Sequence, residues 1–433
     1  MNAVTSGLIP YHTFTLGNGL RVYVHEHHAT PIVSVNLWYH VGSRNERPGR
    51  TGFAHLFEHL MFEGSRNVPH GQFDALLEEA GAINNGSTNP DRTNYWETLP
   101  STALELGLYL EGDRMGGLLD ALTQRELDAQ RDVVKNERRQ SYENRPYGLA
   151  SETMLATLYP PMHPYHWPTI GSMADLDDAE LEDVQQFFRT YYVPGNATLA
   201  VAGDVRADDV ERLVSKWFGD IPAGGAIPDI IVPPMIAGDS AVVLEDSVQL
   251  PRLYLAWHTP ALYARDDAEL DIAARALGDG KASRLFRSLV YESQVAQSVS
   301  SYQSSASLGS TFRIVITARQ GVALGALRDT AIAAVNEMAR NGITQRELDR
   351  ARNGLETGFI DALQNVGGFG GRADQLNHNV FYAGDAGYAD HDMARYKAVT
   401  TERVGAAVHK YLLQPCVTLS VVPRGEAQLA VPA

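Results

Sequence analysis

The chain has 433 residues, which is longer than one typical domain and predicts roughly two to four compact units. Hydrophobic residues make up 44% and charged residues 20% of the sequence, which is typical of a globular protein and excludes a disordered or fibrous one. The 36 Lys and Arg against 52 Asp and Glu give a net charge of -16, so we expect no binding to nucleic acid or to anionic lipid surfaces.

Cysteine content and the N-terminal segment bear on the compartment. Cys416 is the single cysteine, which excludes an intrachain disulfide and a cysteine-based metal site. The N-terminus has no basic segment followed by an apolar stretch, and no run of about 18 apolar residues occurs, so we expect no export signal and no membrane span. The expected location is the cytoplasm. The periplasm is the alternative if a signal peptide has been removed.

The predicted elements follow the same order in both halves of the chain. Residues 20–25 and 32–41 are predicted strands, and the apolar stretch 51–62 fits a short helix. In the second half, 241–244 and 253–258 are predicted strands and 267–277 a helix. Strands grouped with strands and helices with helices predict an α+β fold, with helices packed on a largely antiparallel sheet in each half.

An internal repeat supports two similar halves. Thr-Gln-Arg-Glu-Leu-Asp occurs at 123–128 and again at 344–349, 221 residues later, and in each copy the Thr and Glu predict a capping box that opens a helix. A predicted helix and a strand follow twice at an offset of 220. Pro and Gly residues near 219–238 mark a linker. We therefore predict a zinc-binding catalytic half at 1–222, a linker at 223–237 and a homologous non-catalytic half at 238–433.

The pentapeptide His55-Leu56-Phe57-Glu58-His59 carries the chemistry. Histidines four residues apart project from one helix face, so both imidazoles can reach one metal ion. Glu58 lies on the same face, where it can contact a water molecule on that metal. Two such histidines alone would more often be core or surface residues, but a buried helix gains nothing structurally from adding a glutamate that also needs a polar partner.

The motif H-x-x-E-H resembles that of the inverzincin, or pitrilysin-like, metallopeptidases. The flanks at 37–44 and 62–65, the segment 81–88 and the segment 191–204 are similar to that family as well, so the resemblance covers nearly the whole chain. It implies a clam-like chamber between two halves and one Zn²⁺ per chain. It also implies a zinc-dependent endopeptidase that hydrolyses peptides or unfolded segments by metal-activated water, with Glu58 as the general base.

The resemblance also implies a third ligand on a later helix. In the stretch 133–139 the family register selects Glu137 as that ligand. Seven residues earlier, where the family often has a supporting glutamate, this chain has Gln130, so we expect support of the zinc site to be weaker or reassigned. Glu137 corresponds to Gly358 in the second half, and the motif corresponds to Asp-Ile-Ala-Ala-Arg at 271–275, so only the first half is expected to bind metal.

Substrate and partner expectations follow from the same resemblance. Peptides are expected to add as a strand along 84–88, with Asn85 as a substrate contact, and the alternative is an edge strand left to solvent. The second half of the family usually supplies an arginine and, seven residues later, a tyrosine near the scissile carbonyl, whereas this chain has Val290 and Gln297 there. We therefore expect a heterodimer with a homologous subunit that supplies the pair. A homodimer is the alternative.

Two rival functions stay open. One is a structural or core subunit with little activity, against which the intact motif argues. The other is a metal-dependent hydrolase of a non-peptide bond, against which the long resemblance argues. The histidine groups at 25–28 and 163–166 lack ligand spacing and are predicted to be exposed strand or loop residues.

Overall fold

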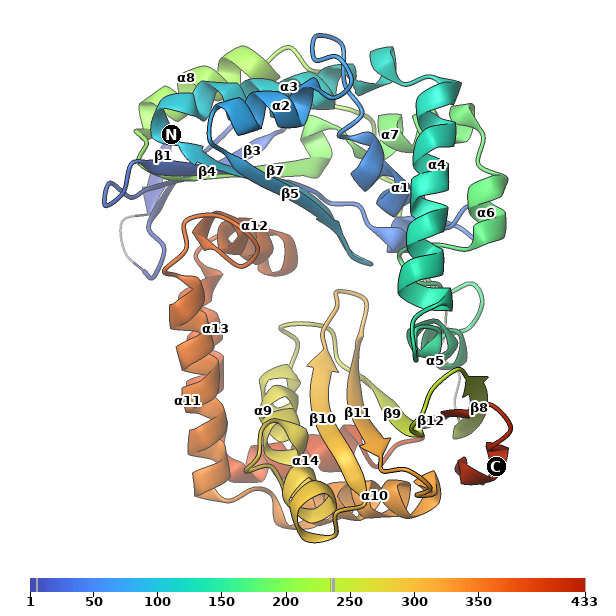
Figure 1. Ribbon diagram of the computed structural model, residues 1–433. Coiled ribbons are helices and arrows are strands. Elements are labelled where there is room, and N and C mark those ends of the chain that lie inside the picture. The colour runs from blue at the N-terminus through green and yellow to red at the C-terminus, as the bar shows by residue number, and fades with distance from the viewer. Residues whose placement is uncertain (5–6, 234, 236–237, 433) are drawn as a thin grey trace. The chain divides into compact units, whose positions relative to one another are not determined.

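Two compact units make up the chain, and each is built on one sheet (Figure 1). The computed structural model describes residues 1–4, 7–233, 235 and 238–432. The first unit comprises Met1–Arg138, Trp167–Ile231 and Gly358–His391, and the second comprises Arg139–His166, Val232–Thr357 and Asp392–Ala433. Each unit therefore includes one segment from the opposite half of the sequence. The predicted linker 223–237 lies partly outside the described residues, and the boundaries at 222 and 238 stay predictions.

The first unit contains a seven-stranded sheet in the order β1-β2-β3-β7-β4-β6-β5. All neighbouring strands are antiparallel except β3 and β7, which are parallel, so the prediction of a largely antiparallel sheet is confirmed. β5 forms one edge. The strands are β1 (Asn2–Val4), β2 (Tyr11–Thr15), β3 (Arg21–Glu26), β4 (Ile32–Tyr39), β5 (Ile83–Thr88), β6 (Thr93–Pro100) and β7 (Ala197–Gly203).

Helices cover both faces of this sheet. Figure 1 shows α3 (Leu104–Ala121) and α8 (Ala207–Phe218) on one face and α12 (Arg372–Ala383) on the other. Both faces of β4 are therefore buried, which explains the near-continuous apolar sequence of that strand. The other helices of this unit are α1 (Phe53–Leu60), α2 (Gln72–Glu79), α4 (Gln124–Arg138), α6 (Met173–Asp177) and α7 (Leu181–Tyr191).

Polar contacts fix α12 on the sheet. The carboxylate of Asp374 accepts hydrogen bonds from Trp38 Nε1 at 2.9 Å and Asn94 Nδ2 at 3.2 Å. Gly367, just before this helix, needs to be glycine because a Cβ there would lie 2.1 Å from Thr98 Oγ1. The segment 358–391 is thus an integral part of the first unit.

The second unit contains a five-stranded sheet in the order β10-β11-β9-β12-β8, antiparallel except for β12 with β8. Helices α9, α10 and α14 pack on one face and α5 on the other. The strands are β8 (Ser240–Asp246), β9 (Arg252–Thr259), β10 (Ala296–Ser304), β11 (Ser310–Ala318) and β12 (Val417–Pro423). The helices are α5 (Ala150–Leu158), α9 (Asp267–Gly278), α10 (Leu324–Asn341) and α14 (Thr401–Tyr411). Two of the boundaries between the units fall inside helices, one within α11 (Gln345–Ala362) and one within α13 (Tyr388–Ala398).

The repeated hexapeptide has the predicted role in both copies. The backbone N–H of Thr123 donates to Glu126 Oε2 at 3.1 Å, and that of Thr344 donates to Glu347 Oε2 at 2.8 Å. These capping boxes open α4 and α11, and the α+β prediction with two similar halves is confirmed. Within the described residues, no helix has both the length and the apolar content needed to cross a bilayer.

Candidate metal centre

Helix α1 carries the motif on a short amphipathic segment. Its eight residues bury Leu56, Phe57 and Leu60 in the core, whereas His55 and His59 lie on the less buried face. The helix starts after Gly52, which has a φ of 90° and no side chain with which to cap the first N–H groups. Residues outside the helix therefore have to accept hydrogen bonds from the first backbone N–H groups of α1.

Glu46 supplies this cap from outside the helix. Its carboxylate accepts hydrogen bonds from the backbone N–H of Gly52 at 2.9 Å and of Ala54 at 2.8 Å, and from Trp167 Nε1 at 3.0 Å. Burial raises the pKa of Glu46 to about 8, against the effect of these donors, which favour the charged form. The sequence analysis missed this residue. A helix start that lacks a capping side chain was the available signal.

We expect Glu46→Gln to weaken zinc binding as well as the fold, because an amide nitrogen cannot accept the N–H groups at the start of α1. Loss of these buried bonds should lower the free energy of unfolding by about 1–3 kcal/mol. Disorienting the histidines should lower zinc affinity about 10- to 100-fold, as loss of ligand-orienting contacts does elsewhere. Thermal unfolding and zinc titration measure the two effects. Glu79→Gln, on the exposed side of α2, is the matched control, and an unchanged zinc affinity would show that Glu46 only stabilises the fold.

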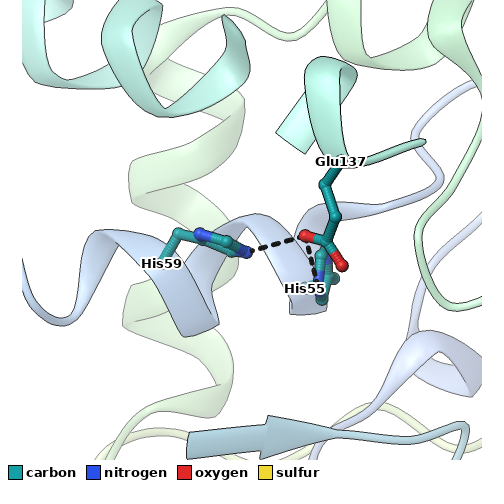
Figure 2. A group of neighbouring side chains, drawn as sticks. All are labelled: His55, His59 and Glu137. Carbon is teal, nitrogen blue, oxygen red and sulfur yellow. Dashed lines mark ion pairs between the residues drawn. The ribbon is translucent and has the colours of Figure 1, made fainter. Parts of the chain in front are cut away.

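The structure brings the three predicted ligands together. Glu137 lies in the last turn of α4, and its Oε2 is 3.6 Å from His55 Nε2 and 3.3 Å from His59 Nε2 (Figure 2). Two ligand atoms bound about 2.0–2.2 Å from one tetrahedral zinc lie about 3.3–3.6 Å apart, so the spacing fits this ion. Among the described residues, these three form the one group of His, Cys, Asp and Glu side chains with ligand atoms close enough to share a metal.

The electrostatics of the group suit a cation. Burial lowers the pKa of His55 to about 4, which keeps its imidazole in the neutral form that binds metals. A hydrogen bond with His59 holds the pKa of Glu137 below its ordinary value, so its carboxylate stays charged. Two imidazoles and one carboxylate are the donor set of many catalytic zinc sites.

Glu58 lies between this group and the edge strand of the sheet. Burial raises the pKa of its carboxyl, which favours proton transfer near neutral pH. A Cβ at Gly86 of β5 would lie 3.3 Å from Glu58 Cγ, so glycine at this position lets the strand pass close to the glutamate. Asn85 is exposed on β5, and its Oδ1 accepts the backbone N–H of Gly86 at 2.8 Å.

Gln130 lies two turns before Glu137 on α4 and contacts another acid. Its Nε2 donates to Glu63 Oε1 at 2.5 Å, and Glu63 Oε2 is 2.9 Å from His70 Nδ1. Glu63 follows His59 by four residues. The carboxylate beside the motif is thus provided by Glu63, whereas position 130 contributes a hydrogen-bond donor.

The counterpart of the motif in the second unit is a structural contact. Asp271 accepts a hydrogen bond from the hydroxyl of Tyr396 at 2.7 Å, and burial raises the pKa of Asp271 to about 7. Val290 packs against the core of that unit, and Gln297 is exposed on β10. Arg284 pairs with Glu347 at 2.7 Å, so this arginine is already engaged within the fold.

One prediction about histidines is wrong. His163 is fully buried and His25 is 6% exposed, although both were expected to be exposed. His163 Nδ1 accepts the backbone N–H of Tyr165 at 3.0 Å, and His25 Nδ1 contacts the Pro10 carbonyl oxygen at 2.6 Å. Arg372 Nη1 also lies 3.2 Å from His25 Nε2, so both ring nitrogens of His25 have polar contacts within the fold.

The fold and the group of His55, His59 and Glu137 fit a metal-binding protein, and comparisons with known proteins identify its family. Residues 21–163 match the insulinase (peptidase family M16) domain, and residues 178–355 match the peptidase M16 inactive domain. The zinc protease PqqE of Helicobacter pylori is 34% identical over 378 residues, which are 86% of this chain and 84% of PqqE. The chain therefore belongs to peptidase family M16, and the resemblance inferred from the motif is confirmed.

Two further relatives show the extent of the similarity. The crystal structure of a protease from Helicobacter pylori superposes with a TM-score of 0.89 at 28% identity and covers 96% of this chain and 100% of that one. A protein named probable mitochondrial-processing peptidase subunit beta, from Arabidopsis thaliana, is 21% identical over 421 residues, which are 94% of this chain and 77% of that protein. The similarity therefore covers nearly the whole chain.

Proposed function

We propose that the chain is a zinc-dependent endopeptidase that hydrolyses peptides or unfolded polypeptide segments. The observation that carries the proposal is the convergence of His55, His59 and Glu137 beside Glu58, on two helices of the first unit. His55, His59 and Glu137 would hold the ion. When bound there, zinc supplies a Lewis acid and a water molecule whose pKa is lowered to about 7.

The residues of the chain have separate roles in this proposal. Glu58 removes a proton from the attacking water and passes it to the leaving amine, so no covalent intermediate with the protein is needed. The edge strand β5 holds the peptide next to Glu58, at the point where Gly86 allows close approach. Main-chain pairing along an edge accepts many sequences, which suits extended or unfolded segments.

Strand addition along β5 predicts a specific pattern of amide protection. The N–H of Gly86 is bonded to Asn85 Oδ1 and points away from β6, and N–H directions alternate along a strand. In Glu58→Gln with an uncleaved peptide, we expect slower hydrogen exchange at Asn84, Gly86 and Thr88, with little change at Asn85 and Ser87. The peptide also has to displace the Asn85 side chain. Amides of β3, far from this edge in the sheet order, are the internal control, and unchanged exchange at Gly86 would count against the proposal.

We also propose that full activity needs a second, homologous chain. Val290 has no side-chain donor for a developing oxyanion, and the neutral amide of Gln297 does not carry the positive charge of an arginine. One lost donor of this kind costs about 10²- to 10³-fold in rate. Arg284 and Tyr291 are also seven residues apart, but Arg284 is paired with Glu347 and Tyr291 is 76% exposed. The similarity to a protein named as a peptidase subunit supports a heterodimer, with a homodimer of modest activity as the alternative.

Zinc analysis and peptide cleavage test these proposals together. We expect the purified chain to bind about one zinc and to cleave unfolded peptides slowly, with a rate that rises about 10²-fold or more when a homologous subunit with the arginine and tyrosine is added. Full activity of the chain alone, unaffected by changing Val290 or Gln297, would exclude the heterodimer. Zinc binding without cleavage under any pairing would favour a structural subunit instead.

A further inference from the structure

One difference between the two units concerns helix α8. In the first unit, α8 packs along α3 over the end of the sheet that contains β3 (Figure 1). The rings of Tyr109 on α3 and Trp217 on α8 are 4.8 Å apart. A Cβ on Gly112 would lie 2.7 Å from the Trp217 carbonyl oxygen, and one on Gly116 would lie 3.2 Å from Ile221. Tyr109, Gly112 and Gly116, on three successive turns of α3, thus form the surface on which α8 and the residues just after it pack.

Helix α10 is the counterpart of α3. Both helices have 18 residues and begin 220 residues apart, at Leu104 and Leu324. Every buried position of α10 is also buried in α3, because Leu327 corresponds to Gly107, Ala331 to Glu111, Val335 to Met115 and Met338 to Leu118. Residues of α10 can therefore be assigned to positions of α3 one by one.

The second unit shows no counterpart of α8 within its described residues. After β12, its described chain forms only a 3-10 turn at Ala427–Leu429. The positions that seat α8 in the first unit correspond to Asp329, Ile332 and Asn336 of α10. All three line a cavity of about 600 Å³. The cavity thus lies where α8 would pack if the second unit had this helix.

The sheet beneath the cavity is correspondingly uncovered. Ala241 of β8 lines the cavity, and Val243, on the same face of that strand, is 47% exposed. In the first unit β3 occupies the equivalent place beside its parallel partner, and its Val22 and Val24 are fully buried. Trp257, Val335 and Leu412 add an apolar floor to the cavity.

We propose that this groove binds an amphipathic helix of a partner protein, in the place that α8 takes in the first unit. Ile332 and Asn336 are larger than the two glycines of α3, so the helix should present small residues to α10. Arg328 pairs with Asp329 at 3.2 Å, which leaves the carboxylate of Asp239 as an excess negative charge at the groove. A basic helix therefore complements the groove and the net charge of -16.

Two synthetic peptides test the proposal. Both have the sequence of residues 207–221, which fills the equivalent place in the first unit, with Trp217→Ala and Ile221→Ala to present small residues to α10. The second also carries Asp208→Lys and Asp209→Lys. We expect saturable binding of the basic peptide in fluorescence anisotropy, at least about tenfold tighter than that of the acidic one and weakened by salt. Cys416, the single cysteine, lines the groove and reports the location, because bound peptide should slow its alkylation.

A matched pair of variants on α10 provides the control. Asn336→Trp fills the groove and should weaken peptide binding about tenfold or more, whereas Ala333→Trp places the same side chain on the exposed side of the helix and should have no effect. Both variants should keep the zinc content and peptidase rate of the parent, which shows that they fold. The proposal is overturned if the basic peptide fails to bind or binds Asn336→Trp equally. It is also overturned if a small apolar dye binds in the groove and neither peptide does. Slower alkylation of Cys416 at higher concentrations of the chain itself would indicate self-association through the groove and would overturn it too.

Discussion

Glu58→Gln is expected to keep a full complement of zinc and to lose hydrolysis. Glu58 is not one of the three side chains whose ligand atoms converge, so its replacement leaves the donor set of His55, His59 and Glu137 unchanged. Glutamine is nearly isosteric with glutamate but cannot take up a proton from water. General base catalysis contributes about 10²- to 10⁴-fold in rate, and we expect kcat to fall by at least that much.

The measurement pairs elemental analysis with steady-state cleavage of an unfolded peptide. Glu78→Gln, on the exposed side of α2, is the matched control and should behave like the parent. The KM of Glu58→Gln should change little if β5 rather than Glu58 holds the peptide. Retained activity would show that another group handles the proton, whereas lost zinc would show that Glu58 is itself needed to hold the ion.

The sequence was sufficient where a local pattern fixes the structure. Periodicity predicted the strands at 20–25, 32–41, 241–244 and 253–258 and the helices at 51–62 and 267–277 to within a few residues, since an alternating or helical pattern depends on near neighbours. The spacing of His55, Glu58 and His59 placed them on one face of a helix. The capping boxes at Thr123 and Thr344 were equally local and have the predicted geometry.

Long-range contacts could not be predicted in this way. Glu46 lies in the loop before α1 and accepts hydrogen bonds from its first N–H groups. Asp374 accepts a hydrogen bond from Trp38, which is more than three hundred residues away in the sequence. No periodicity reports such pairs, because they depend on how elements pack. The burial of His163 was mispredicted for the same reason, since the position of the Tyr165 backbone N–H that donates to its Nδ1 is a property of the folded loop.

Glu137 was assigned by family register, and the structure adds its geometry. It comes from α4, whereas the histidines come from α1, so the centre requires contact between these two helices. The Glu137 carboxylate lies 3.3–3.6 Å from both imidazoles. Any test of the ligand assignment therefore has to separate loss of a ligand from loss of this helix contact.

Glu137→Ala is accordingly expected to lose zinc without unfolding. Removing one of three ligands should lower zinc affinity by more than about 100-fold, because contacts that merely orient a ligand are worth 10- to 100-fold. His55→Ala and His59→Ala should lose the ion in the same way. Asp132→Ala, exposed on the same helix, is the control for α4, and circular dichroism should show the helix content of the parent in every variant. A Glu137→Ala protein with full zinc occupancy would show that a different side chain is the third ligand, with Glu63 the first to examine, because it follows His59 by four residues and contacts Gln130 of α4.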